Sequence, residues 1–457
     1  MYVVFVALIA AIGGLLFGYD TAVINGANDF LRRHFEIDKD GALYGWACSS
    51  ALVGCILGAA GAGFLGDFLG RRKSLLVCAV LFAVSAIGSA LPQSVGVFVI
   101  YRIIGGVGVG AASMLSPMYI AEIAPARLRG RLVSLNQLAI VVGILLAFFA
   151  NYTIQSYGSE RVVGEQAWNV ISGWRWMFGL ETLPAALFFL MLFFVPDSPR
   201  FLMARGKEDA ARTVLGKIGT PDGVDAQIRE IADVLSEERG TLKDFLRPGM
   251  KTALLIGIAL AVFQQWTGIN AIMYYSTDVF KQAGFAGNAA FVNSVGVGLT
   301  NLVFTFVGIA LVDRLGRRPL LIGGAAVQAV SLGIVAVAFA QGSQGWWVLV
   351  AILTYVGAFS ASLGPVVWVV ISEIFPTKIR GRAMGLATLS LWTACYLLSH
   401  TFPILLGSIG PPMTFGLYAG ISVACAVFVA IVVPETKGMS LEDIERHWTR
   451  GRDTMTK

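Results

Sequence analysis

Two seven-residue stretches of this 457-residue chain are near copies of each other. Residues 66–72 read Gly-Asp-Phe-Leu-Gly-Arg-Arg, and residues 312–318 read Val-Asp-Arg-Leu-Gly-Arg-Arg. Each follows a long apolar run, and the two lie 246 residues apart. A single basic turn of this kind can simply fix the orientation of a membrane helix. The repetition therefore says more about the fold than either copy alone.

Two further motifs repeat in the same order. In the first, Glu-Ile-Ala-Pro at 122–125 followed by Arg-Gly-Arg at 129–131 returns as Glu-Ile-Phe-Pro at 373–376 followed by Arg-Gly-Arg at 380–382. In the second, Pro-Asp-Ser-Pro-Arg at 196–200 returns as Pro-Glu-Thr-Lys-Gly at 434–438. All keep one register along the chain, which indicates a duplicated architecture. Duplication of this kind is typical of transporters that rock two helical bundles around a central site.

The composition places the chain in lipid. It is 56% hydrophobic and 14% charged, whereas soluble domains have about 45–50% apolar and about 25% charged residues. Apolar runs long enough to span a bilayer predict twelve helices in a six-plus-six arrangement, because helices satisfy the backbone internally. They are expected near 3–26, 43–66, 74–92, 96–119, 132–153, 176–195, 252–279, 289–312, 320–341, 347–371, 383–406 and 414–433.

The basic residues predict the orientation. If both termini are cytoplasmic, 27 of the 34 Lys and Arg fall in cytoplasmic segments, six fall outside and Arg102 alone lies within a span. This asymmetry follows the positive-inside rule. The net charge of +6 is then explained by topology, so we expect no nucleic-acid partner.

The sequence contains none of the motifs expected of an enzyme. The five cysteines all lie in apolar runs without Cys-x-x-Cys spacing and are expected to be buried, inert thiols. We predict no metal, no cofactor and no enzymatic activity, because metal clusters, catalytic triads and nucleotide loops are missing. The glycine-rich run at 105–110 lies inside an apolar span, where small residues let helices pack closely.

These motifs resemble the sugar porter family of the major facilitator superfamily over nearly the whole chain. Gln-Gln-Trp-Thr-Gly-Ile-Asn at 264–270 and the repeated Pro motifs carry the resemblance, and the stretches 13–24 and 101–110 are most similar to its bacterial D-xylose–proton symporters. The resemblance implies an all-α membrane protein with two six-helix bundles at 1–198 and 249–436, a cytoplasmic helical linker at 199–248 and a cytoplasmic tail at 437–457. It implies a monomer in the bacterial inner membrane whose partners are a monosaccharide, a proton and the lipid bilayer.

Ionisable residues at membrane depth are expected to be functional, and three stand out: Asp20, Arg102 and Glu181. A nearby Arg favours the ionised form of an acid, whereas burial away from it favours the protonated form. Separating the two could therefore load and unload a proton. In the similar symporters, the matching Asp carries the proton and the Arg is its partner. A static ion pair that holds helices together is the structural alternative.

The charged residues of the repeated motifs are expected to form gating salt bridges by analogy with the family, the alternative being simple topology signals. These residues are Asp67, Arg71, Glu122, Arg129, Asp313, Arg317, Glu373 and Arg380.

A sugar site needs amides that donate and accept hydrogen bonds, together with aromatic walls. The family pattern assigns sugar contacts to Gln137, Gln264, Gln265, Asn270, Asn301 and Trp368, and walls to Phe17, Tyr274 and Trp392. Gly268 is expected to interrupt its span as a bending point. Leu391 departs from the family, which has Gln or Asn there, so a pentose, a hexose and a cyclitol stay open as substrates. His400 is expected either to pack between helices or face water, or to act as a proton relay.

Three functions fit the motifs: proton-coupled symport, uncoupled facilitation and sugar sensing without transport. The acids Asp20 and Glu181 favour symport, because the facilitators generally lack them. A sensor usually has a long cytoplasmic tail, whereas here about twenty residues follow Glu435.

Overall fold

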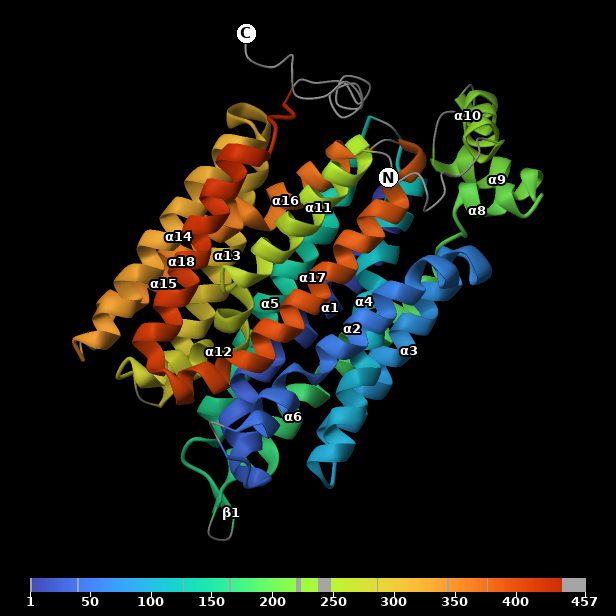
Figure 1. The fold of residues 1–457 in the computed structure, drawn as a ribbon. Helices are drawn as coiled ribbons and strands as arrows, with labels where there is room; N and C mark the ends of the chain where they lie inside the picture. Colours follow the sequence, from blue (N-terminus) through green and yellow to red (C-terminus); the bar gives the residue numbers. More distant parts are fainter. Residues whose placement is uncertain are drawn as a thin grey trace. The chain divides into compact units, whose positions relative to one another are not determined.

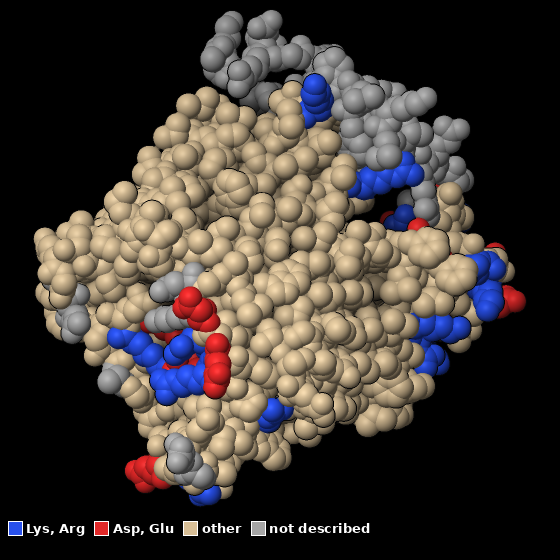
Figure 2. Space-filling model, turned by 60° about the horizontal axis from the view of Figure 1, so that its bottom comes forward, with Lys and Arg blue, Asp and Glu red and all other residues tan. Residues whose placement is uncertain are grey.

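The computed structural model describes residues 2–38, 41–125, 127–163, 166–218, 223–236, 248–285, 287–342, 345–375 and 377–437. Within these residues, twelve helical segments are long and apolar enough to cross a membrane (Figure 1). They coincide with the twelve predicted spans and confirm the all-α membrane fold. Figure 2 shows a face on which charged side chains gather in separate groups and leave wide areas without charge, as expected for a surface in lipid.

The chain forms two compact units. The first comprises Met1–Glu36 with Ser50–Glu238, and the second comprises Ile37–Ser49 with Arg239–Lys457. Helix α2 (Ala42–Leu69) thus contributes its first residues to the second unit and the rest to the first. The domain limits expected after residues 198, 248 and 436 stay a prediction.

Six spans build the first unit. Besides α2 they are α1 (Tyr2–His34), α3 (Arg71–Ala90), α4 (Val95–Ile123), α5 (Arg129–Gly158), and a sixth made of η1 (Asn169–Gly173), α6 (Trp174–Gly179), α7 (Thr182–Met191) and η2 (Leu192–Phe194). A hairpin of β1 (Val162–Val163) and β2 (Gln166–Ala167) precedes the sixth span.

The glycine-rich run of α4 packs closely against another helix, as predicted, and that helix is α2. A Cβ added to Gly106 would lie 1.8 Å from the carbonyl oxygen of Ala51, and one added to Gly110 would lie 2.1 Å from that of Cys55. Such distances are impossible for a real side chain, so only glycine permits this approach of the two helices.

Three short helices follow the sixth span. They are α8 (Pro199–Ala204), α9 (Glu208–Ile218) and α10 (Val224–Ser236), drawn in green in Figure 1. Ser198 begins α8 as a cap, because its hydroxyl accepts a 3.2 Å hydrogen bond from the Phe201 amide. A small apolar core of Ala211, Leu215 and Ile228 joins α9 and α10.

The second unit contains the other six spans. They are α11 (Pro248–Trp266) with α12 (Ile269–Gln282), α13 (Asn288–Leu315), α14 (Arg317–Ala340), α15 (Trp346–Ala361) with α16 (Leu363–Ile374), α17 (Thr377–Ser408) and α18 (Gly410–Val432). Two of these spans are interrupted. The break at Gly268 was predicted, whereas the one at Ser362 was not.

The repeated motif has the same geometry in both units. Gly70 precedes α3 with φ +86°, and Gly316 precedes α14 with φ +92°. Only glycine adopts this region without strain, which explains why both copies of the motif carry it at the turn between two helices.

Candidate functional site

The two ionisable residues Asp20 and Arg102 meet inside the first unit. Both side chains are buried, at 2% and 0% exposure. Arg102 Nη1 donates to the Asp20 carboxylate, and Nη2 donates to the Asp20 carbonyl oxygen at 3.2 Å. The guanidinium also lies 5.3 Å from the ring centroid of Phe178. The pair therefore joins α1 to α4 and touches α6.

Glu181 completes this cluster from the sixth span. It lies in the turn between α6 and α7, where Pro184 lacks the N–H that would bond the carbonyl of Leu180. Its carboxylate is 1% exposed and interacts electrostatically with both Asp20 and Arg102. The structure thus brings together the three residues that were singled out as intramembrane charges.

The helix α1, which carries Asp20, packs closely on α5. A Cβ on Gly18 would lie 1.9 Å from the carbonyl oxygen of Ile140. Gln137 lies about one turn before Ile140 on α5, and Phe17 lies beside Gly18 on α1. Both side chains are half-buried. These two candidate sugar contacts therefore belong to the same closely packed helix pair as Asp20.

In the second unit, three predicted amides form one hydrogen-bonded chain. Asn270 Nδ2 donates to Gln265 Oε1, and Gln265 Nε2 donates to Gln264 Oε1 at 3.5 Å. Gln264 Nε2 donates in turn to the carbonyl oxygens of Leu363 and Gly364, at 2.8 and 3.0 Å. The chain crosses the break in one span and ends at the break in another.

The break between α11 and α12 has its own partner. Gly268 has φ +103°, and the Thr267 carbonyl before it accepts a 3.0 Å hydrogen bond from the Tyr355 hydroxyl. A carbonyl released from a helix inside a membrane needs such a donor. Tyr355 therefore stabilises the bent form of this span.

The other candidate sugar residues of this unit are placed as follows. Asn301 Oδ1 accepts a 2.7 Å hydrogen bond from the Ser360 hydroxyl, and among the described residues no hydrogen bond links Asn301 to the amide chain. Tyr274, Leu391 and Trp392 are buried, and Trp368 is half-buried on α16. His400 stacks on Tyr396, with ring centroids 5.6 Å apart.

The motif charges pair within each unit. In the first, Arg71 bonds Glu122 at 2.9 Å and Asp67 at 3.3 Å. In the second, Arg317 bonds Glu373 at 2.9 Å and Asp313 at 3.2 Å. Arg129 is exposed and has no ion pair among the described residues, and the side chain of Arg380 lies outside them.

The repeated Pro motif places an acid at the start of a helix in each unit, Asp197 at α3 and Glu435 at α14. Glu435 accepts hydrogen bonds of 3.0 Å from the backbone amides of both Arg317 and Arg318 at the N-terminus of α14. Burial alone would raise its pKa, but these amides and that of Lys437 hold the pKa of Glu435 below its ordinary value. The pKa of Asp197 is raised, because burial outweighs its interaction with Arg72.

Sequence reasoning missed several residues of the second unit. Cys395 was expected to be inert and is buried, but its sulfur accepts a 3.1 Å hydrogen bond from Asn270 Nδ2. Cys395 lies one helical turn after Leu391 and so on the same face of the helix as a candidate site residue, which could have indicated its place beside the site. Tyr355 and Ser360 carried no comparable signal, since their partners are set by the packing of distant spans.

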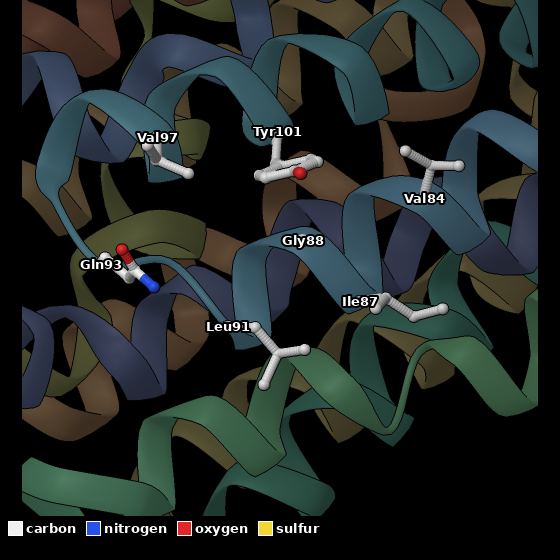
Figure 3. Close-up of a pocket in the computed structure, with 7 residues that line it drawn as sticks. All are labelled: Val84, Ile87, Gly88, Leu91, Gln93, Val97 and Tyr101. Carbon is white, nitrogen blue, oxygen red and sulfur yellow. The ribbon is translucent and has the colours of Figure 1, made fainter.

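A pocket lies apart from all these residues, between α3 and α4 (Figure 3). Most of the side chains that line it are apolar, and no candidate site residue is among them. They are Val84, Ile87, Gly88, Leu91, Gln93, Val97 and Tyr101. Among the described residues, no group of three His, Cys, Asp or Glu is arranged to hold a metal ion.

Comparison with known proteins places this arrangement in context. A family model described as "Sugar (and other) transporter" matches residues 6–448. The D-xylose-proton symporter of Escherichia coli (strain K12) is 42% identical over 477 residues, which cover 98% of this chain and 96% of that protein. The arabinose-proton symporter of Bacillus subtilis (strain 168) is 41% identical over 451 residues, with 98% and 96% covered. A solved structure of the E. coli xylose transporter, partially occluded and inward-open, matches with a TM-score of 0.84 at 39% identity, covering 95% of this chain and 100% of that one.

Proposed function

This chain belongs to the sugar transporter family, and from that premise we propose that it carries a monosaccharide across the membrane together with a proton. Membership makes it a multi-pass membrane transporter rather than an enzyme. The named relatives are proton symporters for xylose and arabinose. We propose a pentose such as D-xylose or a related hexose as the substrate.

The buried cluster of Asp20, Arg102 and Glu181 is the observation that carries the proposal. One guanidinium balances one carboxylate, so the cluster is electrically neutral when one of its two acids holds a proton. Neutral clusters are favoured at membrane depth, because a net charge there is costly. Proton binding would thus be tied to the arrangement of α1, α4 and the sixth span, as symport requires.

The amides and aromatic residues provide the sugar contacts in this proposal. In the first unit, Gln137 and Phe17 lie on the helix pair that holds Asp20. In the second, Gln264, Gln265 and Asn270 form a connected set beside a bendable span. The remaining proposed contacts are Asn301, Trp368, Tyr274, Trp392 and Leu391.

We also propose that the motif charges gate transport by alternating access. Arg71–Glu122 and Arg317–Glu373 hold helix ends together within their units, and several such pairs can bias an equilibrium of a few kcal/mol. Arg129 and Arg380 complete this set by family analogy. The basic-residue asymmetry supports cytoplasmic termini, and we propose, by family analogy, a monomer in the bacterial inner membrane.

Uptake by purified protein in liposomes tests the function. A panel of pentoses, hexoses and inositol is offered with and without an inward proton gradient. Symport predicts that at least one sugar accumulates above its outside concentration only with the gradient. Equilibration without accumulation would instead establish a facilitator, and no uptake of any sugar would favour a sensor.

A further inference from the structure

The orientation of the Asn270 side chain is fixed by two acceptors. Its amide nitrogen has two hydrogens, and Nδ2 donates both to Gln265 Oε1 and to Cys395 Sγ, the latter at 3.1 Å. No described residue donates to its oxygen, Oδ1. The group that Asn270 offers to a ligand is therefore an acceptor.

The amide chain behind Asn270 maintains this direction. Gln265 can accept from Asn270 because its own Nε2 donates to Gln264, and Gln264 is held by two backbone carbonyls that can only accept. Turning Asn270 over would point its oxygen at the oxygen of Gln265. Hydrogen bonds are thus donated in one direction, from Asn270 through Gln265 and Gln264 to the carbonyls at the break near Ser362.

Cys395 holds the other side of the same amide. It lies on α17 and is 1% exposed, one turn after the apolar Leu391. A thiol sulfur is a weak acceptor, yet here it accepts a hydrogen bond from the second amide hydrogen. The site is buried, where an amide hydrogen without a partner would be destabilising. Without it, the Asn270 amide would be held only by its bond to Gln265, which prevents a full turn but leaves the position of Oδ1 less restricted.

We propose that Cys395 is a positioning residue for sugar recognition, which holds Asn270 so that its oxygen accepts from a donating hydroxyl of the substrate. The inference rests on the proposed sugar transport and specifies, for one contact, which partner donates the hydrogen bond. A sugar hydroxyl recognised here acts as donor. Replacing it by fluorine, which can accept but cannot donate, should then weaken binding as much as removing it.

The first test needs one variant of the recognised amide. Deoxy and deoxyfluoro analogues of the transported sugar are titrated against wild type and Asn270→Ala by calorimetry in detergent. The relevant hydroxyl is the one whose removal weakens binding about tenfold in wild type and has little effect in Asn270→Ala. At that position, the fluoro analogue should bind as weakly as the deoxy analogue. A fluoro analogue that binds like the parent sugar would overturn the assignment.

The second test addresses Cys395 directly. Cys395→Ala should raise KM for exchange several-fold and leave the maximal rate within about twofold, whereas Cys395→Ser, which keeps an acceptor, should restore KM. Cys425→Ala is the matched control, a buried thiol of the same unit outside the amide chain, and it should leave KM unchanged. Wild-type KM in Cys395→Ala, or equal loss in the Ala and Ser variants, would contradict positioning. Failure of the proposed function would look different, because wild type itself would then bind no sugar.

Discussion

Arg102 bonds Asp20 at two points, its carboxylate and its backbone carbonyl oxygen, the second at 3.2 Å. The backbone bond does not depend on the charge of the Asp20 side chain. The two helices that carry these residues can therefore stay together when the carboxylate is neutral. This separates the role of the pair in holding the fold from its proposed role in carrying a proton.

Asp20→Asn should abolish accumulation of sugar and preserve sugar exchange. The amide is close in shape to the protonated acid but cannot release a proton, so the coupled step is lost. Uptake driven by a pH gradient and exchange across liposomes that hold sugar on both sides measure the two properties.

The control for this variant is Asp29→Asn on the same helix. Asp29 pairs with Arg32 and Arg33 outside the cluster, so its neutralisation should leave accumulation intact. An Asp20→Asn protein that still concentrates sugar in response to a pH gradient would show that Asp20 is not the coupling residue.

Gln264→Ala, Gln265→Ala, Asn270→Ala and Gln137→Ala should each weaken sugar binding by about 1–3 kcal/mol, because hydroxyl groups of the substrate lose their partners. Calorimetric titration of each purified variant gives the affinity. Gln328→Ala is the control, a buried amide on α14 outside the chain, and should bind normally. Unchanged affinity in all four variants would remove the proposed sugar contacts.

Leu391→Gln should change the rank order of competing pentoses and hexoses. Leu391 offers only apolar contact, so a hydroxyl placed against it lacks a partner at a cost of about 1–3 kcal/mol, which the new amide would recover. Proton coupling should persist, because Asp20 and Arg102 belong to the other unit. Competition assays across a sugar panel decide this, and an unaltered order would exclude Leu391 from the site.

Glu435→Gln should lower the free energy of unfolding by about 1 kcal/mol at neutral pH, because the carboxylate stabilises the N-terminus of α14. Its pKa is lower in the folded protein than its ordinary value of 4.5. The stabilisation is therefore present above that value and is lost as pH falls through the folded pKa. Melting of wild type and variant should converge in that range.

Asp313→Asn is the matched control for Glu435→Gln. Asp313 also pairs with the start of α14, through Arg317, but its side chain is 79% exposed, and exposed pairs contribute about 0–1 kcal/mol. Its effect should be smaller than that of Glu435→Gln at every pH. A difference between wild type and Glu435→Gln that grows as pH falls would contradict the capping role.

The sequence was sufficient to predict the fold and to single out the three buried charged residues that lie together in the first unit. Length and hydropathy predicted all twelve spans, because a bilayer admits few alternatives to helices. Asp20, Arg102 and Glu181 could be singled out, since charges are rare at membrane depth. The break at Gly268 followed from a glycine beside polar residues, and its positive φ confirms the reason.

The remaining contacts depend on packing between distant spans. The break at Ser362 precedes Pro365, whose missing N–H leaves the Ala361 carbonyl without its helical partner, but one proline does not always interrupt a span. Cys395 was read as inert because a thiol in an apolar run usually is. Its bond to Asn270 joins residues 125 positions apart, which periodicity along one helix cannot reveal.

Movement of protons on sugar addition is the most direct measure of whether sugar and proton cross together. Transported sugar is added to the outside of de-energised, weakly buffered proteoliposomes while the outside pH is recorded. Valinomycin and potassium are present to balance charge. We predict that wild type makes the outside medium more alkaline on sugar addition, and that Asp20→Asn does not. Entry of the sugar into wild-type liposomes without any change in outside pH would contradict proton-coupled transport.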